Sequence, residues 1–145
     1  MKTALLILLA LILAAALWVR LAPSDPARWH AKPQMPEPGP GDWPEATGFR
    51  AQRIFEGNPP AVLAAFDAIA RATPRTTRIA GSPESGMVTY RTRSRVWGFP
   101  DYTTVAAEPA GTGTRLLVHG RLRFGGNDLG VNRARIEGWL RALTP

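Results

Sequence analysis

The stretches Thr114–Phe124, TRLLVHGRLRF, and Gly125–Leu140, GGNDLGVNRARIEGWL, decide the fold. The first alternates, with Leu116, Val118, Gly120, Leu122 and Phe124 on one side and Arg115, Leu117, His119, Arg121 and Arg123 on the other. A period of two is typical of a β-strand with one buried face. The second spaces its apolar residues three and four apart, which predicts a helix. The chain therefore closes with a strand followed by a helix that packs on the sheet.

An asparagine interrupts the apolar stripe of this closing helix. At 100° per residue, one face carries Leu129, Asn132, Ile136, Leu140 and Leu143, so the amide is expected to point toward the sheet. A buried amide without partners costs about 1–3 kcal/mol. Asn132 is therefore expected either to tie the helix to the Arg123–Asn127 loop or the Gly98–Asp101 segment, or to line a ligand pocket beneath the helix N-terminus. Asp128 is expected to cap the helix by accepting from the N–H groups of Gly130 and Val131.

Upstream, the pattern predicts four more strands and one more helix. The strands are expected at residues 49–55, 76–80, 86–96 and 101–108, and the helix at residues 57–74. Asn58 is placed to cap this helix, Pro59 suits its first position, and Thr73-Pro74 ends it. The order is β-α-β-β-β-β-α. It predicts an α+β two-layer sandwich, a five-stranded, mainly antiparallel sheet with two helices on one face, preceded by an N-terminal membrane helix.

The face of the sheet without helices is expected to be basic. In the strand at residues 86–96, Thr89, Arg91, Arg93 and Arg95 oppose Val88, Tyr90, Thr92 and Ser94. Together with the closing strand, this gives a candidate basic face of Arg91, Arg93, Arg95, Arg115, His119 and Arg121. Such a face is either simply solvated or binds an anion such as a lipid head group. Interleaved aromatic residues that would stack on bases are missing, so nucleic acid is not an expected partner.

The first twenty residues have the pattern of a membrane anchor or a signal peptide. Lys2 precedes an uncharged stretch that runs to Val19, and Arg20 ends it. A membrane anchor needs about 17–25 apolar residues, whereas a signal peptide has a shorter apolar region and a small-residue cleavage site, for which Ala14–Ala16 is the candidate. Because the apolar character continues past these alanines, we favour an uncleaved single-pass anchor in the inner membrane, with the domain in the periplasm. Secretion to the periplasm after cleavage is the alternative.

These boundaries divide the chain into three parts. Residues 1–20 are the anchor or signal segment, and residues 49–145 are the folded domain. Between them, residues 21–48 are dense in proline and glycine and show no periodicity, which is typical of a semi-extended linker. Trp29 and Trp43 are placed to pack this linker on the domain surface.

Composition excludes several kinds of site. The chain has 145 residues, no cysteine, two histidines and a net charge of +7. Without cysteine there is no disulfide, thiolate metal site or cysteine nucleophile. No zinc-protease helix, serine-hydrolase elbow or phosphate-binding glycine loop is present. We therefore predict no catalytic residue, no metal and no cofactor; an enzymatic activity stays open, with its absence favoured.

Two segments carry a resemblance to a known family. In VWGFPDY the matching positions are Gly98, Phe99 and Asp101, and in the closing segment they are Arg123, Gly125, Asp128, Leu129, Gly130, Asn132, Arg133, Arg135 and Ile136. This pattern is similar to the signature of DUF1499, a family of uncharacterised proteins, over roughly Arg50 to Leu143. Relatives often carry a cysteine-containing segment before the first strand, where this chain has proline. The resemblance implies domain limits and no reaction.

Three functions follow as hypotheses. The favoured one is a membrane-tethered, non-catalytic domain of the bacterial cell envelope that binds an anionic or amphipathic ligand such as lipid. The second is an enzyme that acts on an anionic substrate near Asp101, Asp128, Asn132 and Arg133. The third is a protein-interaction module of an envelope complex that uses an exposed sheet edge. The candidate ligand-binding residues are Asp101, Arg123, Asp128, Asn132 and Arg133, and Asp101 is expected to pair with Arg123 or Arg133.

Overall fold

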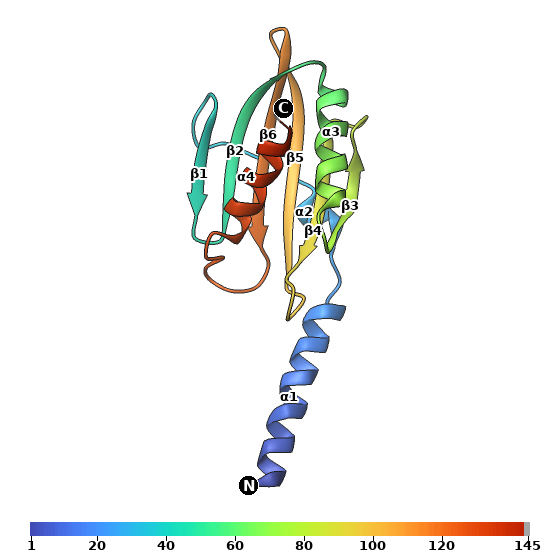
Figure 1. Ribbon diagram of the computed structural model, residues 1–145, viewed down its shortest axis with the longest axis vertical. Helices are drawn as coiled ribbons and strands as arrows, with labels where there is room; N and C mark the ends of the chain where they lie inside the picture. Colours follow the sequence, from blue (N-terminus) through green and yellow to red (C-terminus); the bar gives the residue numbers. More distant parts are fainter. Residues whose placement is uncertain (144–145) are drawn as a thin grey trace.

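The computed structural model describes residues 1–143 and shows four helices and one antiparallel sheet of six strands (Figure 1). In chain order the elements are α1 (Lys2–Leu21), α2 (Pro26–Trp29), β1 (Gly41–Glu45), β2 (Gly48–Glu56), α3 (Pro59–Ala72), β3 (Thr76–Ser82), β4 (Met87–Arg93), β5 (Pro100–Ala110), β6 (Gly113–Leu122) and α4 (Val131–Leu143). The strand order is β1-β2-β6-β5-β4-β3. The expected mixed architecture and antiparallel sheet are confirmed.

The expected number of strands is wrong by one. The additional strand, β1, lies in the segment that the proline content predicted to be linker, and it pairs with β2 so that Pro44 faces Phe49. Proline cannot donate to a ladder, but β1 is an edge strand, where one missing donor is tolerated. The short α2, capped by Asp25, was also not predicted.

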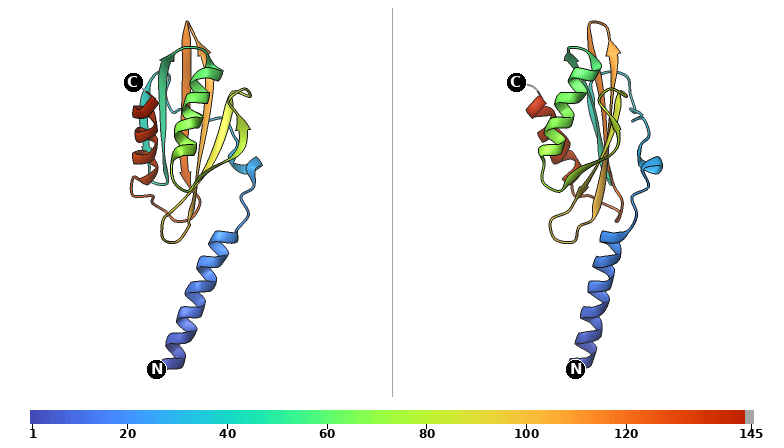
Figure 2. Two further views of the ribbon diagram at one scale, coloured as in Figure 1. Left: turned by 45° about the vertical axis from the view of Figure 1, so that its right-hand side comes forward. Right: turned by 90° about the vertical axis from the view of Figure 1, so that its right-hand side faces the viewer.

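The core lies between the sheet and the two long helices of the domain, α3 and α4, which cover the same sheet face (Figure 2). The alternation in β6 and β4 is confirmed: Leu116, Val118, Val88 and Tyr90 are fully buried on this face. Asn58 caps α3 as expected, accepting from the backbone N–H of Ala61 at 2.9 Å. The interface is filled by rings rather than open, because Phe66, Tyr90 and Trp139 pack edge to face or tilted with centroids 5.6–6.3 Å apart.

A buried carboxylate that the sequence did not indicate joins α3 to the sheet. Asp67 accepts from the Tyr90 hydroxyl at 2.9 Å and from Arg78 at 3.4 Å. Burial raises the pKa of Tyr90 and the negative charge of Asp67 raises it further, so the phenol stays protonated and keeps donating. This network satisfies polar groups inside the core and accounts for an acidic residue on the apolar face of α3.

Gly120 sets how closely α4 approaches the sheet. A Cβ atom at this position would lie 2.8 Å from Oδ1 of Asn132 and 2.8 Å from Cδ1 of Ile136. Both partners lie on the buried face of α4, and both are fully buried. Glycine in β6 therefore gives the first half of α4 the room to pack directly on the strand.

The opposite face of the sheet is covered by residues 22–38, which we call the strap (Figure 2, right). Trp29 is buried and stacks on Tyr102 with ring centroids 4.0 Å apart and an interplanar angle of 13°. Its carbonyl accepts from Arg121 at 2.7 Å and from the Thr104 hydroxyl at 2.8 Å. His30 contacts Thr89 at 2.9 Å. This part of the segment expected to be a linker thus forms the layer that covers this face of the sheet.

Helix α1 extends away from one end of the domain (Figure 1). It is long and apolar enough to cross a membrane, and a signal sequence has the same character. Its last turn contacts the domain: the Trp18 and Phe124 rings lie 5.7 Å apart, and Arg20 donates to the carbonyl of Val96 at 3.0 Å. The β4–β5 and β6–α4 loops lie at this same end of the domain.

Candidate functional site

The buried amide of Asn132 lies in a cluster with Asp101 and Arg135. Asn132 has no exposed surface, its Oδ1 accepts from Arg135 at 2.9 Å, and its Nδ2 donates to Asp101 at 3.4 Å. Arg135 also pairs with Asp101 at 3.1 Å. The amide therefore bridges two charged groups and joins the first turn of α4 to the start of β5. This is the structural role expected for Asn132, with a side-chain partner in the Gly98–Asp101 segment.

The electrostatics of this cluster balance burial against pairing. Burial raises the pKa of Asp101, and the neighbouring charge of Asp128 raises it too. Arg135 and the Asn132 amide oppose this rise by favouring the ionised carboxylate. All three side chains have partners within the cluster, so the arrangement is that of a structural tie.

Asp128 holds the start of α4 in a slightly different way from the one expected. Its carboxylate accepts from the backbone N–H of Gly130 at 2.9 Å, as predicted, and from that of Asn132 at 3.0 Å instead of Val131. Its own N–H donates to Ala46 and so ties this loop to the β1–β2 turn. Because α4 starts at Val131, Leu129 lies outside it, has φ 52° and is exposed. The expectation that Leu129 faces the sheet is wrong.

The other two candidates lie apart from this cluster. Arg133 is exposed and pairs with Glu137 at 2.7 Å, and its guanidinium lies 5.8 Å from the Phe49 ring. Arg123 is on the strap side of the sheet, where it donates to the carbonyl of Pro23 at 2.8 Å. The arginine that pairs with Asp101 is Arg135, so the expected pairing with Arg123 or Arg133 is wrong. The five candidate residues do not form one pocket.

The predicted basic face is also divided. Arg115 lies near Glu108, Arg121 donates to the strap at the carbonyl of Trp29, and His119 lies against Arg50 and Glu45. Burial, together with Arg121 and Arg50, lowers the pKa of His119 from 6.5 to about 3. Glu45 lies 3.2 Å from Nε2 of His119 and favours a proton there, but Arg50 already pairs with Glu45 at 2.9 Å and faces the same nitrogen at 3.3 Å. Arg50 therefore neutralises the charge of Glu45, and the imidazole of His119 stays neutral.

His119 gives the stability a pH dependence that can be measured. Below about pH 6.5 His119 is protonated in the unfolded chain, whereas in the folded chain it stays neutral down to about pH 3. The free energy of unfolding should therefore decrease as the pH is lowered through this window, by at most about 1.4 kcal/mol per pH unit. Melting of the detergent-solubilised chain between pH 7.5 and 4.5 should show a shallower fall for His119→Gln. The other titrating groups are common to both proteins, and identical slopes would contradict the burial of a neutral imidazole.

A second group of basic residues gathers where α1 meets the domain. The arginine cluster consists of Arg20, Arg75, Arg91, Arg93 and Arg95, and these residues line a cavity of about 310 Å³ together with Thr77, Ser94 and Gly98. Three of its members were predicted as part of the basic face; Arg20 and Arg75 were not. Arg75 has φ 60°, an uncommon conformation for a residue with a side chain. Its Nε donates to the carbonyl of Arg93 at 3.1 Å.

Within residues 1–143, no carboxylate neutralises the positive charge of the arginine cluster. Its hydrogen bonds go to neutral oxygens, for example from Arg93 to the carbonyls of Gly98 at 2.8 Å and Arg20 at 3.0 Å. Among residues 1–143, none of its members forms an ion pair with a carboxylate. Burial lowers the pKa of Arg93, and the positive charges of Arg91 and Arg20 lower it further. An anion in this cavity would relieve that repulsion.

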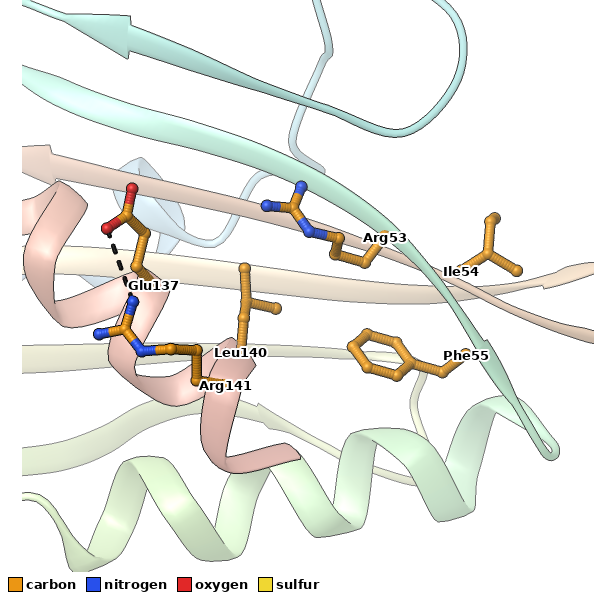
Figure 3. Close-up of a pocket in the computed structure, with 6 residues that line it drawn as sticks. All are labelled: Arg53, Ile54, Phe55, Glu137, Leu140 and Arg141. Atoms are coloured by element: carbon orange, nitrogen blue, oxygen red, sulfur yellow. Dashed lines mark ion pairs between the residues drawn. The ribbon is translucent and has the colours of Figure 1, made fainter. Parts of the chain in front are cut away.

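A cavity of about 460 Å³ opens between β2 and α4 (Figure 3). Its floor is apolar, from Phe55 and Leu140, and its charged groups are already paired. Nη2 of Arg53 donates to both carboxylate oxygens of Asp42, at 2.7 and 2.9 Å, and Glu137 pairs with Arg133 and Arg141. A ligand here would have to displace these ion pairs, whereas the arginine cluster forms none with the part of the chain that the structure describes.

The comparison with known families agrees with the two segments singled out in the sequence. The family model described as "Protein of unknown function (DUF1499)" matches residues 23–143. The chain belongs to the DUF1499 family. A search of curated proteins returned no match. The DUF1499 match starts at residue 23 rather than near Arg50 and so includes the strap and β1, in agreement with their packing on the sheet.

The DUF1499 residues of the two segments have architectural positions in this chain. Asp101, Asn132 and Arg135 form the tie, Asp128 holds the turn before α4, and Gly98 lies beneath Arg20, whose Cγ would be 3.1 Å from a Cβ added there. Within the described residues, no three His, Asp or Glu side chains are arranged to hold a metal ion. The group best placed to take a ligand is the arginine cluster.

Proposed function

We propose that this protein is a single-pass, membrane-tethered and non-catalytic domain of the bacterial cell envelope, and that it binds the phosphate head group of an anionic lipid at the arginine cluster. Helix α1 is the anchor in the inner membrane, and the domain lies in the periplasm. Arginine suits this role because its guanidinium fork matches phosphate oxygens and stays charged. The anion arrives from the surface into which α1 inserts.

The observation that carries the proposal is the character of the end of the domain where α1 leaves. After α1, the exposed large apolar side chains among residues 22–143 are Ile54, Val96, Trp97, Phe99, Leu129 and Val131. All but Ile54 lie on or beside the two loops at this end. Exposed apolar side chains grouped beside unpaired arginines are the expected surface of a domain that rests on anionic lipid.

The contacts of the last turn of α1 favour an uncleaved anchor. Val19 is buried, Trp18 packs near Phe124, and Arg20 lines the arginine cavity. Cleavage after Ala16 would leave Leu17 and Trp18 as an exposed apolar end beside the domain. Trp18 is also at the position where an interfacial aromatic residue is favoured.

Binding of phosphatidylglycerol to the full-length chain in neutral detergent tests the proposal, with native mass spectrometry as the measurement. The wild type should retain phosphatidylglycerol in preference to phosphatidylcholine. The double variant Arg91→Gln/Arg95→Gln should bind it roughly 30-fold more weakly, because each basic residue contributes about 1 kcal/mol near an anionic surface. Binding should also weaken as salt is added.

The matched control is Arg71→Gln/Arg141→Gln, which removes the same charge from two exposed helix positions. It should bind as the wild type does. Equal retention of the two lipids by the wild type, or equal losses in both double variants, would overturn the proposal, because binding would then ignore either the anion or the position of the arginines.

A further inference from the structure

An apolar groove lies along α1, next to the arginine cluster in the chain. It has a volume of about 330 Å³, and its walls are Ile12, Ala15, Ala16 and Val19 from α1, facing Trp97 and Phe99 from the β4–β5 loop. The α1 residues are spaced by three and four and so form one stripe of the helix. From Ile12 to Arg20 the stripe runs about 12 Å along the helix axis.

The groove and the arginine cavity have no lining residue in common, but their lining residues are neighbours in two segments of the chain. Val19 lines the groove and the next residue, Arg20, lines the cavity; Gly98 lines the cavity between the two aromatic residues of the groove. Arg20 also donates to the carbonyl of Val96, at the start of the same loop. A molecule that fills both spaces therefore passes directly from cationic to apolar surroundings.

We propose that the cavity and the groove form one site, which takes a single anionic lipid with its phosphate at the arginine cluster and one acyl chain along α1. This inference rests on the proposed function and specifies its ligand. A free phosphate would meet the arginines and leave the groove empty, and a neutral hydrocarbon would leave the arginine charges unmatched. An amphiphilic anion satisfies both. The occupant is a lipid rather than a protein segment because the groove runs along the helix proposed to lie in the bilayer.

The site also explains the glycine between its two aromatic residues. Gly98 has φ 72°, and a Cβ there would lie 3.1 Å from both Cγ and Nε of Arg20. Glycine lets the β4–β5 loop turn and lets the Arg20 side chain lie across the junction of the two spaces. Trp97 and Phe99 are 48% and 40% exposed, so a chain in the groove has apolar surface on both sides.

Filling the groove tests the inference. Ala16→Phe places a ring in it, and full-length protein in detergent should then bind dioleoyl phosphatidylglycerol about tenfold more weakly, since roughly two buried methylene groups lose their contacts. Ala14→Phe is the matched control: it adds the same ring on the opposite side of α1 and should bind as the wild type does. Ala15→Phe fills the groove from a second position and should repeat the result even if Ala16→Phe folds poorly.

A series of chain lengths separates this inference from the proposed function. The wild type should bind dioleoyl phosphatidylglycerol more tightly than the dihexanoyl lipid, and Ala16→Phe and Ala15→Phe should lose most of that preference. If both phenylalanine variants keep the wild-type preference for the longer lipid while Arg91→Gln/Arg95→Gln still weakens binding, the acyl chain does not lie in the groove. The head-group site would then stand alone. If no variant changes either the chain-length preference or the affinity, both the groove inference and the proposed head-group site are overturned. More than one tightly retained lipid per chain would also contradict a single site.

Discussion

Asn132→Leu is expected to lower the free energy of unfolding by about 3 kcal/mol. Leucine has a similar volume but cannot accept from Arg135 or donate to Asp101, so two largely buried charged groups each lose a hydrogen bond. Such bonds to charged groups contribute about 1.5–3 kcal/mol each. For a chain of this length the melting temperature of the detergent-solubilised protein should fall by about 10 °C. Circular dichroism at 222 nm measures it.

The variant is best compared with Asn127→Leu, which makes the same change five residues earlier on an exposed loop. Asn127 accepts from the N–H of Leu129 at 2.7 Å on an exposed loop, so its loss should cost under about 1 kcal/mol. A double-mutant cycle with Asp101→Asn should give a coupling energy of about 1 kcal/mol or more. Wild-type melting of Asn132→Leu, or strictly additive losses, would show that the amide does not tie α4 to β5.

Gly120→Ala is expected to destabilise the domain by about 2–3 kcal/mol, because the added methyl group has no room. It would press on Oδ1 and Cβ of Asn132, at 2.8 and 3.1 Å, and on Ile136 at 2.8 Å. Overpacking a tight core costs about 1–3 kcal/mol, and here it also disturbs the Asn132 tie. Thermal melting should therefore show a loss of about 6–9 °C.

Gly138→Ala gives the opposite sign from the same substitution. A Cβ atom at Gly138, on α4, meets nothing within 4 Å. Alanine should stabilise the helix there by about 0.5–1 kcal/mol. Should Gly120→Ala melt at or above the wild-type temperature, the close approach of α4 to β6 would not be what requires glycine.

The sequence predicted those features that follow from local periodicity. Alternation in β6 and β4 assigned the face that packs on α3 and α4, and Asn58 and Pro59 marked the start of α3, because these signals depend on neighbouring residues alone. The inward direction of Asn132 followed in the same way, since it depends only on the rotation per residue along α4. These predictions concern one element at a time.

Features that depend on how elements meet were not predictable in this way. The partner of Asp101 is Arg135 because α4 starts at Val131 and its first turns lie near the start of β5, and neither fact can be read from spacing. Trp29 was expected to pack on the domain surface and does so on Tyr102, but the proline content gave no sign that residues 22–38 cover a face of the sheet. The arginine cluster needed three distant segments to converge, so only part of it was found.

The packing of the strap also limits how far the domain can reach. A free segment from residue 21 to residue 48 would extend to about 95 Å and would let the domain search the space far from its point of attachment. Here that length is consumed on the sheet, and the fold begins within one turn of the end of α1. In the proposed orientation the domain can hardly move away from the membrane surface. Any molecule that it meets must therefore reside in the same membrane or be delivered to its surface.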